Sequence, residues 1–65
     1  MNFRKGQKVH WNDPGIYDYD EEDRFAVLSR VFTIEDVDNR NGTAYIVCEE
    51  WGSEAEVYTD ELEPI

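Results

Sequence analysis

Apolar and polar residues alternate along much of this chain, and a period of two predicts short β-strands. The clearest prediction is a hairpin. It joins an apolar run at 31–37 to a second run at 43–48 through Asn41 and Gly42, which favour a tight two-residue turn because both tolerate positive φ. Both faces of the second run are largely apolar, so we expect that strand to lie centrally in the sheet.

The same alternation predicts further strands on either side of the hairpin. A first strand is expected at 7–11 and a fourth at 54–58, where glutamates alternate with small apolar residues and should face outward. A single helical turn, with Thr59 as its N-cap, should lead into a short last strand that ends at Ile65.

The segment between the first two strands lacks this alternation. Residues 16–23 are expected to form an acidic surface loop. Over 24–29, Phe25 and Leu28 are three residues apart and acids precede them. That pattern favours one or two helical turns, with a strand as the alternative.

Size and charge exclude several classes of function. A chain of 65 residues should form one domain, 1–65, whose small core leaves little room for a deep active-site pocket. A net charge of −10 disfavours direct binding to nucleic acid or to an anionic membrane. One cysteine and one histidine cannot supply a zinc site of four protein ligands. Without a long apolar segment or a signal-peptide pattern, a cytoplasmic protein is the expectation.

Candidate catalytic residues are sparse. His10 has no acid or nucleophile at a spacing typical of a catalytic dyad, so we expect a solvated or hydrogen-bonded histidine. Cys48 lies in an apolar strand without a basic neighbour, which predicts a buried, unreactive thiol. An EF-hand alignment on Gly42 fails at the first and last ligand positions, and the acids at 18–23 should be solvated, with loose Ca²⁺ binding as the alternative. We therefore expect no enzyme, no cofactor and no metal site.

The predicted order is a strand, a long loop, a tight hairpin, a second tight turn, a strand, a helical turn and a last strand. This layout resembles the SH3-like small barrel of SH3, Tudor, chromo-barrel and KOW-type domains. A more specific similarity, to small and mostly uncharacterised bacterial proteins of this type, is carried by GQKVHWNDP at 6–14, SEAEVY at 53–58 and ELEP at 61–64. The resemblance implies an all-β SH3-like barrel of about five short strands with a long first loop, and it brings no known activity.

Charge is distributed unevenly between the two ends of the chain. Residues 1–11 contain Lys and Arg but no acid, whereas residues 41–65 contain acids but no Lys or Arg. In SH3-like barrels the first and last strands run side by side, which would bring the basic residues at 4–8 against the acidic residues at 61–63. Exposed pairs of this kind select a neighbour more than they stabilise it.

Aromatic residues make up 14% of the chain, more than so small a core readily buries. A Tudor-type site combines aromatic side chains with a nearby acid at one end of the barrel, because a ring quadrupole attracts a cation. We expect the first loop to meet the loop between the second and third strands at such an end, where its tyrosines would form a surface for a basic peptide. The alternative is that these tyrosines pack the loop onto the barrel. Outside the first loop, Tyr45 and Tyr58 are expected on outward strand faces and Trp51 in a turn. The candidate binding residues are Tyr17, Asp18, Tyr19, Tyr45, Trp51 and Tyr58.

Two functional hypotheses follow from these residues. The first is a non-catalytic interaction module, most simply a monomer, whose acidic and aromatic surface docks a Lys/Arg-rich segment of a partner protein. The alternative is an acidic nucleic-acid mimic that blocks a basic DNA- or RNA-binding protein. A third reading, an accessory domain beside a larger system, gains if no binder is found.

Overall fold

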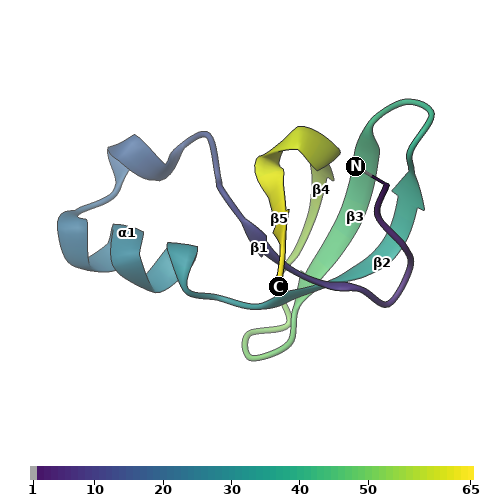
Figure 1. The fold of residues 1–65 in the computed structure, drawn as a ribbon. Helices are drawn as coiled ribbons and strands as arrows, with labels where there is room; N and C mark the ends of the chain where they lie inside the picture. Colours follow the sequence, from purple (N-terminus) through teal and green to yellow (C-terminus); the bar gives the residue numbers. More distant parts are fainter. Residues whose placement is uncertain (1) are drawn as a thin grey trace.

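The protein folds as a five-stranded antiparallel sheet with one short α-helix (Figure 1). The computed structural model describes residues 2–65, apart from the side chain of Tyr17. The strands are β1 (Lys8–Trp11), β2 (Phe32–Asp38), β3 (Thr43–Cys48), β4 (Glu54–Tyr58) and β5 (Leu62–Pro64), and the helices are η1 (Ile16–Asp18), α1 (Glu21–Leu28) and η2 (Thr59–Glu61). The mostly β character expected from the alternation is confirmed.

The strands are ordered β4-β3-β2-β1-β5 across the sheet, and each adjacent pair is antiparallel. The first and last strands therefore lie side by side, as expected, with His10 opposite Glu63 and Trp11 opposite Leu62. β3 lies inside the sheet, as expected, although the middle strand is β2. β3 still has a neighbour on each side, which suits a strand with two largely apolar faces.

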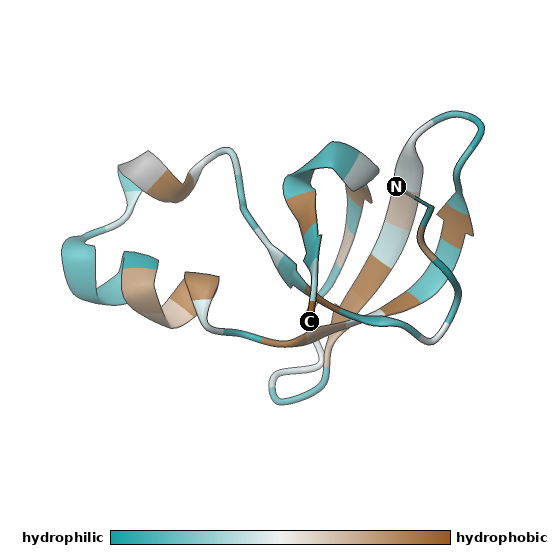
Figure 2. Ribbon diagram, in the orientation of Figure 1, coloured by the Kyte–Doolittle hydropathy of each residue, from teal (hydrophilic) through white to brown (hydrophobic). Residues whose placement is uncertain are grey.

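One face of the sheet buries the core. Ile46 and Val9 are fully buried, and Ile34 is 1% exposed. Figure 2 shows the apolar positions recurring along β2 and β3. Full burial of such side chains contributes about 1.5–3 kcal/mol each. The remaining buried members of this cluster are Phe3, Phe32, Ala44, Cys48, Val57 and Leu62.

The turn between β2 and β3 differs from the tight two-residue turn expected. Four residues, 39–42, separate the two strands, and Asn41 does not adopt positive φ; only Gly42 does, at 71°. The carboxylate of Asp38 accepts hydrogen bonds from the backbone N–H groups of Arg40 and Asn41. These hydrogen bonds from Arg40 and Asn41 to Asp38 favour a four-residue turn over a two-residue one, because they satisfy backbone N–H groups within the turn. The turn ends at Gly42, which adopts the left-handed conformation.

The connection between β1 and β2 is more ordered than a surface loop. Ile16 is buried at 4% exposure, and α1 begins at Glu21, so the loop expected over 16–23 is corrected. Acidic residues fill the first turn of α1, where the helix dipole favours negative charge. The helix buries Val27, whereas Phe25 remains 76% exposed, so the spacing that predicted helical turns did not identify the buried face.

α1 lies at one end of the molecule and the β2–β3 turn at the other (Figure 1). The two loops expected to meet at one end are thus far apart, and that expectation is wrong. The β1–β2 connection joins β2 at its first residue, and the β2–β3 turn leaves β2 at its last residue, so the two lie at opposite ends of that strand. The β1–β2 connection would have to fold back along the sheet to reach the turn. It extends away instead, and the described part of the chain measures 34 × 21 × 18 Å.

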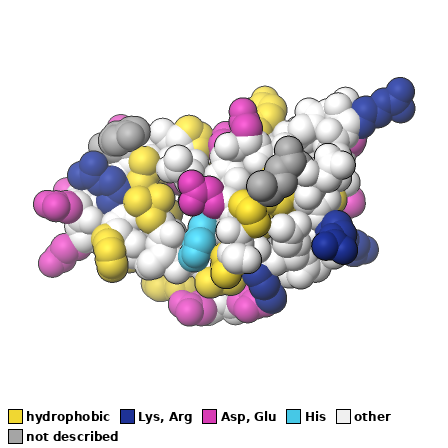
Figure 3. Space-filling model, in the orientation of Figure 1, with side chains coloured by type: hydrophobic (Ala, Val, Ile, Leu, Met, Phe, Trp, Pro, Cys, Tyr) yellow, Lys and Arg dark blue, Asp and Glu magenta, His cyan; other side chains and the backbone are white. Residues whose placement is uncertain are grey.

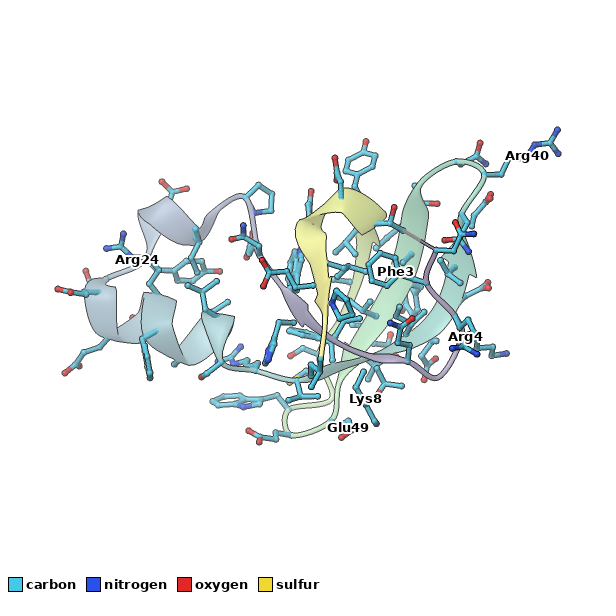
Figure 4. The ribbon with its side chains drawn as sticks, in the orientation of Figure 1. Phe3, Arg4, Lys8, Arg24, Arg40 and Glu49 are labelled. Atoms are coloured by element: carbon cyan, nitrogen blue, oxygen red, sulfur yellow. The ribbon has the colours of Figure 1, made fainter. Side chains whose placement is uncertain are left out.

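Two finer expectations are also corrected near the chain ends. η2 begins at Thr59 without a side-chain cap, and Thr59 contributes its backbone N–H, which donates to the carbonyl of Gly42 over 2.8 Å. The ammonium of Lys8 forms an ion pair with Glu49, not with the acids at 61–63, and Figure 4 shows these two labelled residues next to each other. No helix among residues 2–65 is both long and apolar enough to cross a lipid bilayer.

Candidate functional site

The outward face of β2, β3 and β4 carries a concentration of carboxylates around two tyrosines. Side chains alternate along each strand, and Ala44 and Ile46 are buried, so Tyr45 between them points outward. The register then places Asp36 of β2 and Glu56 of β4 directly opposite Tyr45, one on each side. We call this surface the acidic face; its residues are Asp36, Asp38, Thr43, Tyr45, Glu54, Glu56 and Tyr58.

A β-bulge puts Asp36 on this face. With regular alternation Asp36 would share the core side with Ile34, because the two are two residues apart. The pairing shifts register between them, so Ile34 faces Ile46 while Asp36 faces Tyr45. Glu35 is the extra residue, and both acids are exposed. The bulge therefore adds a carboxylate to the acidic face without burying a charge.

The acidic face is hollowed beside Tyr45. A hollow of about 420 Å³ lies between Asp36 and Asp38 of β2, Tyr45 of β3 and Glu56 of β4. Its wall is largely polar, and its charged groups are all carboxylates. Such a lining suits an ammonium or guanidinium group better than an apolar ligand.

Tyr45 is held in place by a neighbouring acid. Its hydroxyl donates to Glu54 Oε2 over 2.5 Å. This hydrogen bond, followed by burial and by the charges of Glu54 and Glu35, raises the pKa of the Tyr45 phenol above its ordinary 10.0. The phenol therefore stays protonated and neutral near neutral pH, and its ring orientation is fixed against β4.

Lys8 of β1 lies on the same outward side of the sheet, beyond Thr33, and its ammonium is ion-paired with Glu49 and so partly neutralised. The seven residues of the acidic face include no Lys or Arg. The nearest in sequence is Arg40, and Figure 4 shows it extending outward from the tip of the β2–β3 turn. Because the carboxylates come from adjacent strands, they lie within about one Debye length of one another and their fields add. The face can attract a cation and would repel a phosphate.

The structure separates the six candidate binding residues. Tyr45 and Tyr58 both lie on the acidic face. Trp51 lies in the β3–β4 turn and is 67% exposed, with the guanidinium of Arg30 centred 4.4 Å above its ring. Asp18 and Tyr19 lie in or next to η1 on the β1–β2 connection, and the side chain of Tyr17 lies outside the described residues.

Sequence reasoning did not single out the carboxylates of the acidic face as site residues. The alternation in 54–58 did place Glu54 and Glu56 outward, so these two had a signal. Asp36 had none, because its orientation depends on the bulge. What joined these acids to Tyr45 was the strand register, which no single segment reveals.

His10 is held by a hydrogen bond, and Cys48 is buried. His10 Nδ1 donates to the backbone carbonyl of Arg30 over 3.0 Å, which confirms a hydrogen-bonded histidine. A second hollow, of about 350 Å³, lies between Leu28 of α1 and the β1–β5 pair, beside this ring. Figure 3 shows the histidine at the surface of this side of the molecule. Cys48 is 1% exposed, so the expected burial of its thiol is confirmed.

Across residues 2–65, apart from the Tyr17 side chain, no group of three or more His, Cys, Asp or Glu side chains is arranged to hold a metal ion. Comparison with protein-family models, curated proteins and solved structures gives no match for this chain. The protein is therefore described by its fold and its surface: it is a small antiparallel sheet with an acidic outer face that contains two tyrosines.

Proposed function

We propose that this chain is a non-catalytic interaction module that docks a Lys/Arg-rich segment of a partner protein on its acidic face. One observation carries the proposal: Tyr45 lies between Asp36 and Glu56, across strands from both, beside an open hollow. A cation placed there contacts the negative face of an aromatic ring and donates charge-assisted hydrogen bonds to carboxylates on two sides.

We further propose that the sheet is an SH3-like barrel. The strand order, the pairing of β1 with β5 and the 3₁₀ turn between β4 and β5 support this layout. The β1–β2 connection departs from the expected layout because it extends away from the sheet. A docking surface on the outer face of β2–β4 does not depend on that connection.

Peptide titration tests the docking proposal. A Lys/Arg-rich peptide and a Gln-substituted peptide of the same length would be titrated by calorimetry at low salt. The variant with Asp36→Asn and Glu56→Gln should bind the basic peptide about tenfold more weakly, the equivalent of about 1.4 kcal/mol. The control variant, with Glu21→Gln and Glu22→Gln on α1, removes the same charge and should change binding by less than about twofold.

Equal losses in the two variants would show that net charge alone attracts the peptide and would contradict a site on the acidic face. Tyr45→Phe provides a second check. It keeps the ring but removes the hydroxyl that bonds Glu54, so binding should survive, whereas Tyr45→Ala should reduce it.

The alternative function, a nucleic-acid mimic, is favoured by a net charge of −10 on so small a chain. A mimic presents spaced charges, so its binding should weaken steeply with salt and should tolerate Tyr45→Ala. Docking through Tyr45 should depend less on salt and fail in that variant. A pull-down from host lysate, followed by the salt titration, separates the two.

A further inference from the structure

β4 forms an edge of the sheet. Across residues 2–65, it hydrogen-bonds to β3 alone, and β5 forms the opposite edge. β5 is three residues long and ends at Pro64, whereas β4 has five residues and no proline. An edge strand presents unpaired N–H and C=O groups that another extended segment can join.

The ladder shows which backbone groups of β4 are free. Just before β4, the N–H of Cys48 donates to the carbonyl of Ser53, and just after it the N–H of Thr59 donates to the carbonyl of Gly42. In an antiparallel pair, every second residue directs both of its backbone groups at the neighbour. Ser53 and Thr59 direct their backbone groups at β3, and so does every second residue between them. The residues that alternate with these direct their N–H and C=O groups away from β3. These are Glu54, Glu56 and Tyr58.

The same residues place their side chains on the acidic face. Val57 is buried and Ala55 is half-buried on the core side, whereas Glu54, Glu56 and Tyr58 are exposed. A strand added antiparallel to β4 would therefore align every second side chain with this exposed row. Its intervening side chains would lie beside Ala55 and Val57.

We propose that the basic partner segment binds as an added antiparallel β-strand on the free edge of β4, with Lys or Arg at every second position beside Glu54 and Glu56. This inference rests on the proposed docking function and specifies its geometry. The antiparallel direction follows every pairing already in the sheet. Backbone hydrogen bonds supply affinity, and the alternating charges supply specificity.

A second copy of this chain is a poor occupant of the same edge. Antiparallel pairing of two β4 strands through their free groups would place glutamates of one copy beside glutamates of the other. Like charges directly across a ladder are destabilising. The glutamates therefore oppose self-pairing while attracting a basic strand.

The first test compares two peptides of one composition. One alternates, Thr-Lys-Val-Lys-Val-Lys-Thr, and the other groups its cations, Thr-Val-Lys-Lys-Lys-Val-Thr. Both carry the same charge, so simple attraction to the acidic face treats them alike. Strand addition predicts that the alternating peptide binds about tenfold more tightly.

N-methylation provides the second test. A methyl group on the amide of the central Lys removes a donor aimed at Glu56 and should weaken binding about tenfold. The same methyl group on a Val amide points away from β4 and should leave affinity within about threefold of the parent peptide. On the protein, Glu56→Pro removes the matching free N–H without breaking the β3–β4 ladder, and it should weaken binding beyond the loss caused by Glu56→Gln.

The outcomes separate the two proposals. Equal binding of both peptides, with no effect of either methyl group, would overturn strand addition and leave docking on the acidic face intact. A loss caused by the Val methyl group alone would overturn the antiparallel arrangement. If neither peptide binds at low salt, the docking function itself fails, and this inference fails with it.

Discussion

Tyr45 and Glu54 are joined across β3 and β4 by a hydrogen bond of 2.5 Å from the phenol to the carboxylate. Tyr45 directly faces Glu56 in the ladder, so Glu54 lies diagonally across from it on the same face. Diagonal neighbours on one face of a sheet are within reach of a long aromatic side chain. The bond orients a neutral ring among carboxylates, the arrangement on which the docking proposal depends.

The first prediction concerns the ionisation of Tyr45. Glu54→Gln should lower the pKa of the phenol toward 10.0, because it removes the main hydrogen bond and charge that raise it. Ultraviolet absorbance titration of both proteins, each compared with its Tyr45→Phe form, isolates this group. Glu35→Gln removes a charge that raises the pKa without removing the bond, and it should lower the pKa less. Equal shifts would contradict the hydrogen bond as the main cause.

The raised pKa of Tyr45 also determines how the free energy of unfolding changes with pH. The folded protein holds the Tyr45 proton more tightly than the unfolded chain, so the contribution is present below pH 10.0 and is lost as pH rises through the raised pKa. Urea unfolding of the wild type should therefore show a steeper alkaline loss of stability than unfolding of Tyr45→Phe. Parallel losses in the two proteins would contradict a raised folded-state pKa.

The second prediction concerns the β2–β3 turn. Gly42 has a φ of 71°, a region that costs an ordinary L-residue about 1–2 kcal/mol, so Gly42→Ala should destabilise the fold by that amount. Its backbone also accepts the hydrogen bond from Thr59 that ties η2 to this turn. Gly15, with a φ of −83°, is the control, and Gly15→Ala should change the unfolding free energy by less than about 0.5 kcal/mol.

The third prediction uses the two faces of β3. Ile46 is fully buried in the core cluster, and Ile46→Ala should cost about 2–5 kcal/mol because it leaves a cavity in that core. Val47, the next residue, lies half-buried on the outward face, and Val47→Ala should cost about 1 kcal/mol or less. Chemical denaturation measures both. A larger loss at Val47 would mean that the outward face is covered by other parts of the protein.

Local patterns predicted the elements of this fold better than their arrangement. The strands at 32–38 and 43–48 match the apolar runs closely, because side-chain alternation is a property of each strand alone. Ile16 is buried and α1 extends away from the sheet, and neither feature is a property of one strand's alternation. Alternation alone did not indicate either feature.

For the candidate site, the sequence predicted the positions of single residues but not how they are grouped. Tyr45 and Tyr58 were expected on outward faces, and both lie there. Trp51 was expected in a turn and is found there, but its ring face is covered by Arg30, a residue of the distant β1–β2 connection. The grouping of Tyr45 with Asp36 required a bulge and a register, which are set by pairing between strands.

The last prediction tests that bulge. Removing Glu35 leaves Ile34 followed by Asp36 and Val37, which is a regular alternation of inward, outward and inward positions. The existing partners, Ile46 for Ile34 and Tyr45 for Asp36, then form an uninterrupted ladder. Deletion of Glu35 should therefore preserve the fold, with an unfolding free energy within about 1 kcal/mol of the wild type.

Deletion of Thr33 is the matched control for the loss of Glu35. It removes one residue from a part of β2 that has no bulge. The residues either before or after the deletion must then turn to the opposite face, which exposes an apolar side chain. Exposure of Phe32 or Ile34 should cost about 3 kcal/mol or more. Urea unfolding of both deletion variants measures the difference. If both are equally destabilised, Glu35 is not a removable extra residue, and the outward orientation of Asp36 must have another cause.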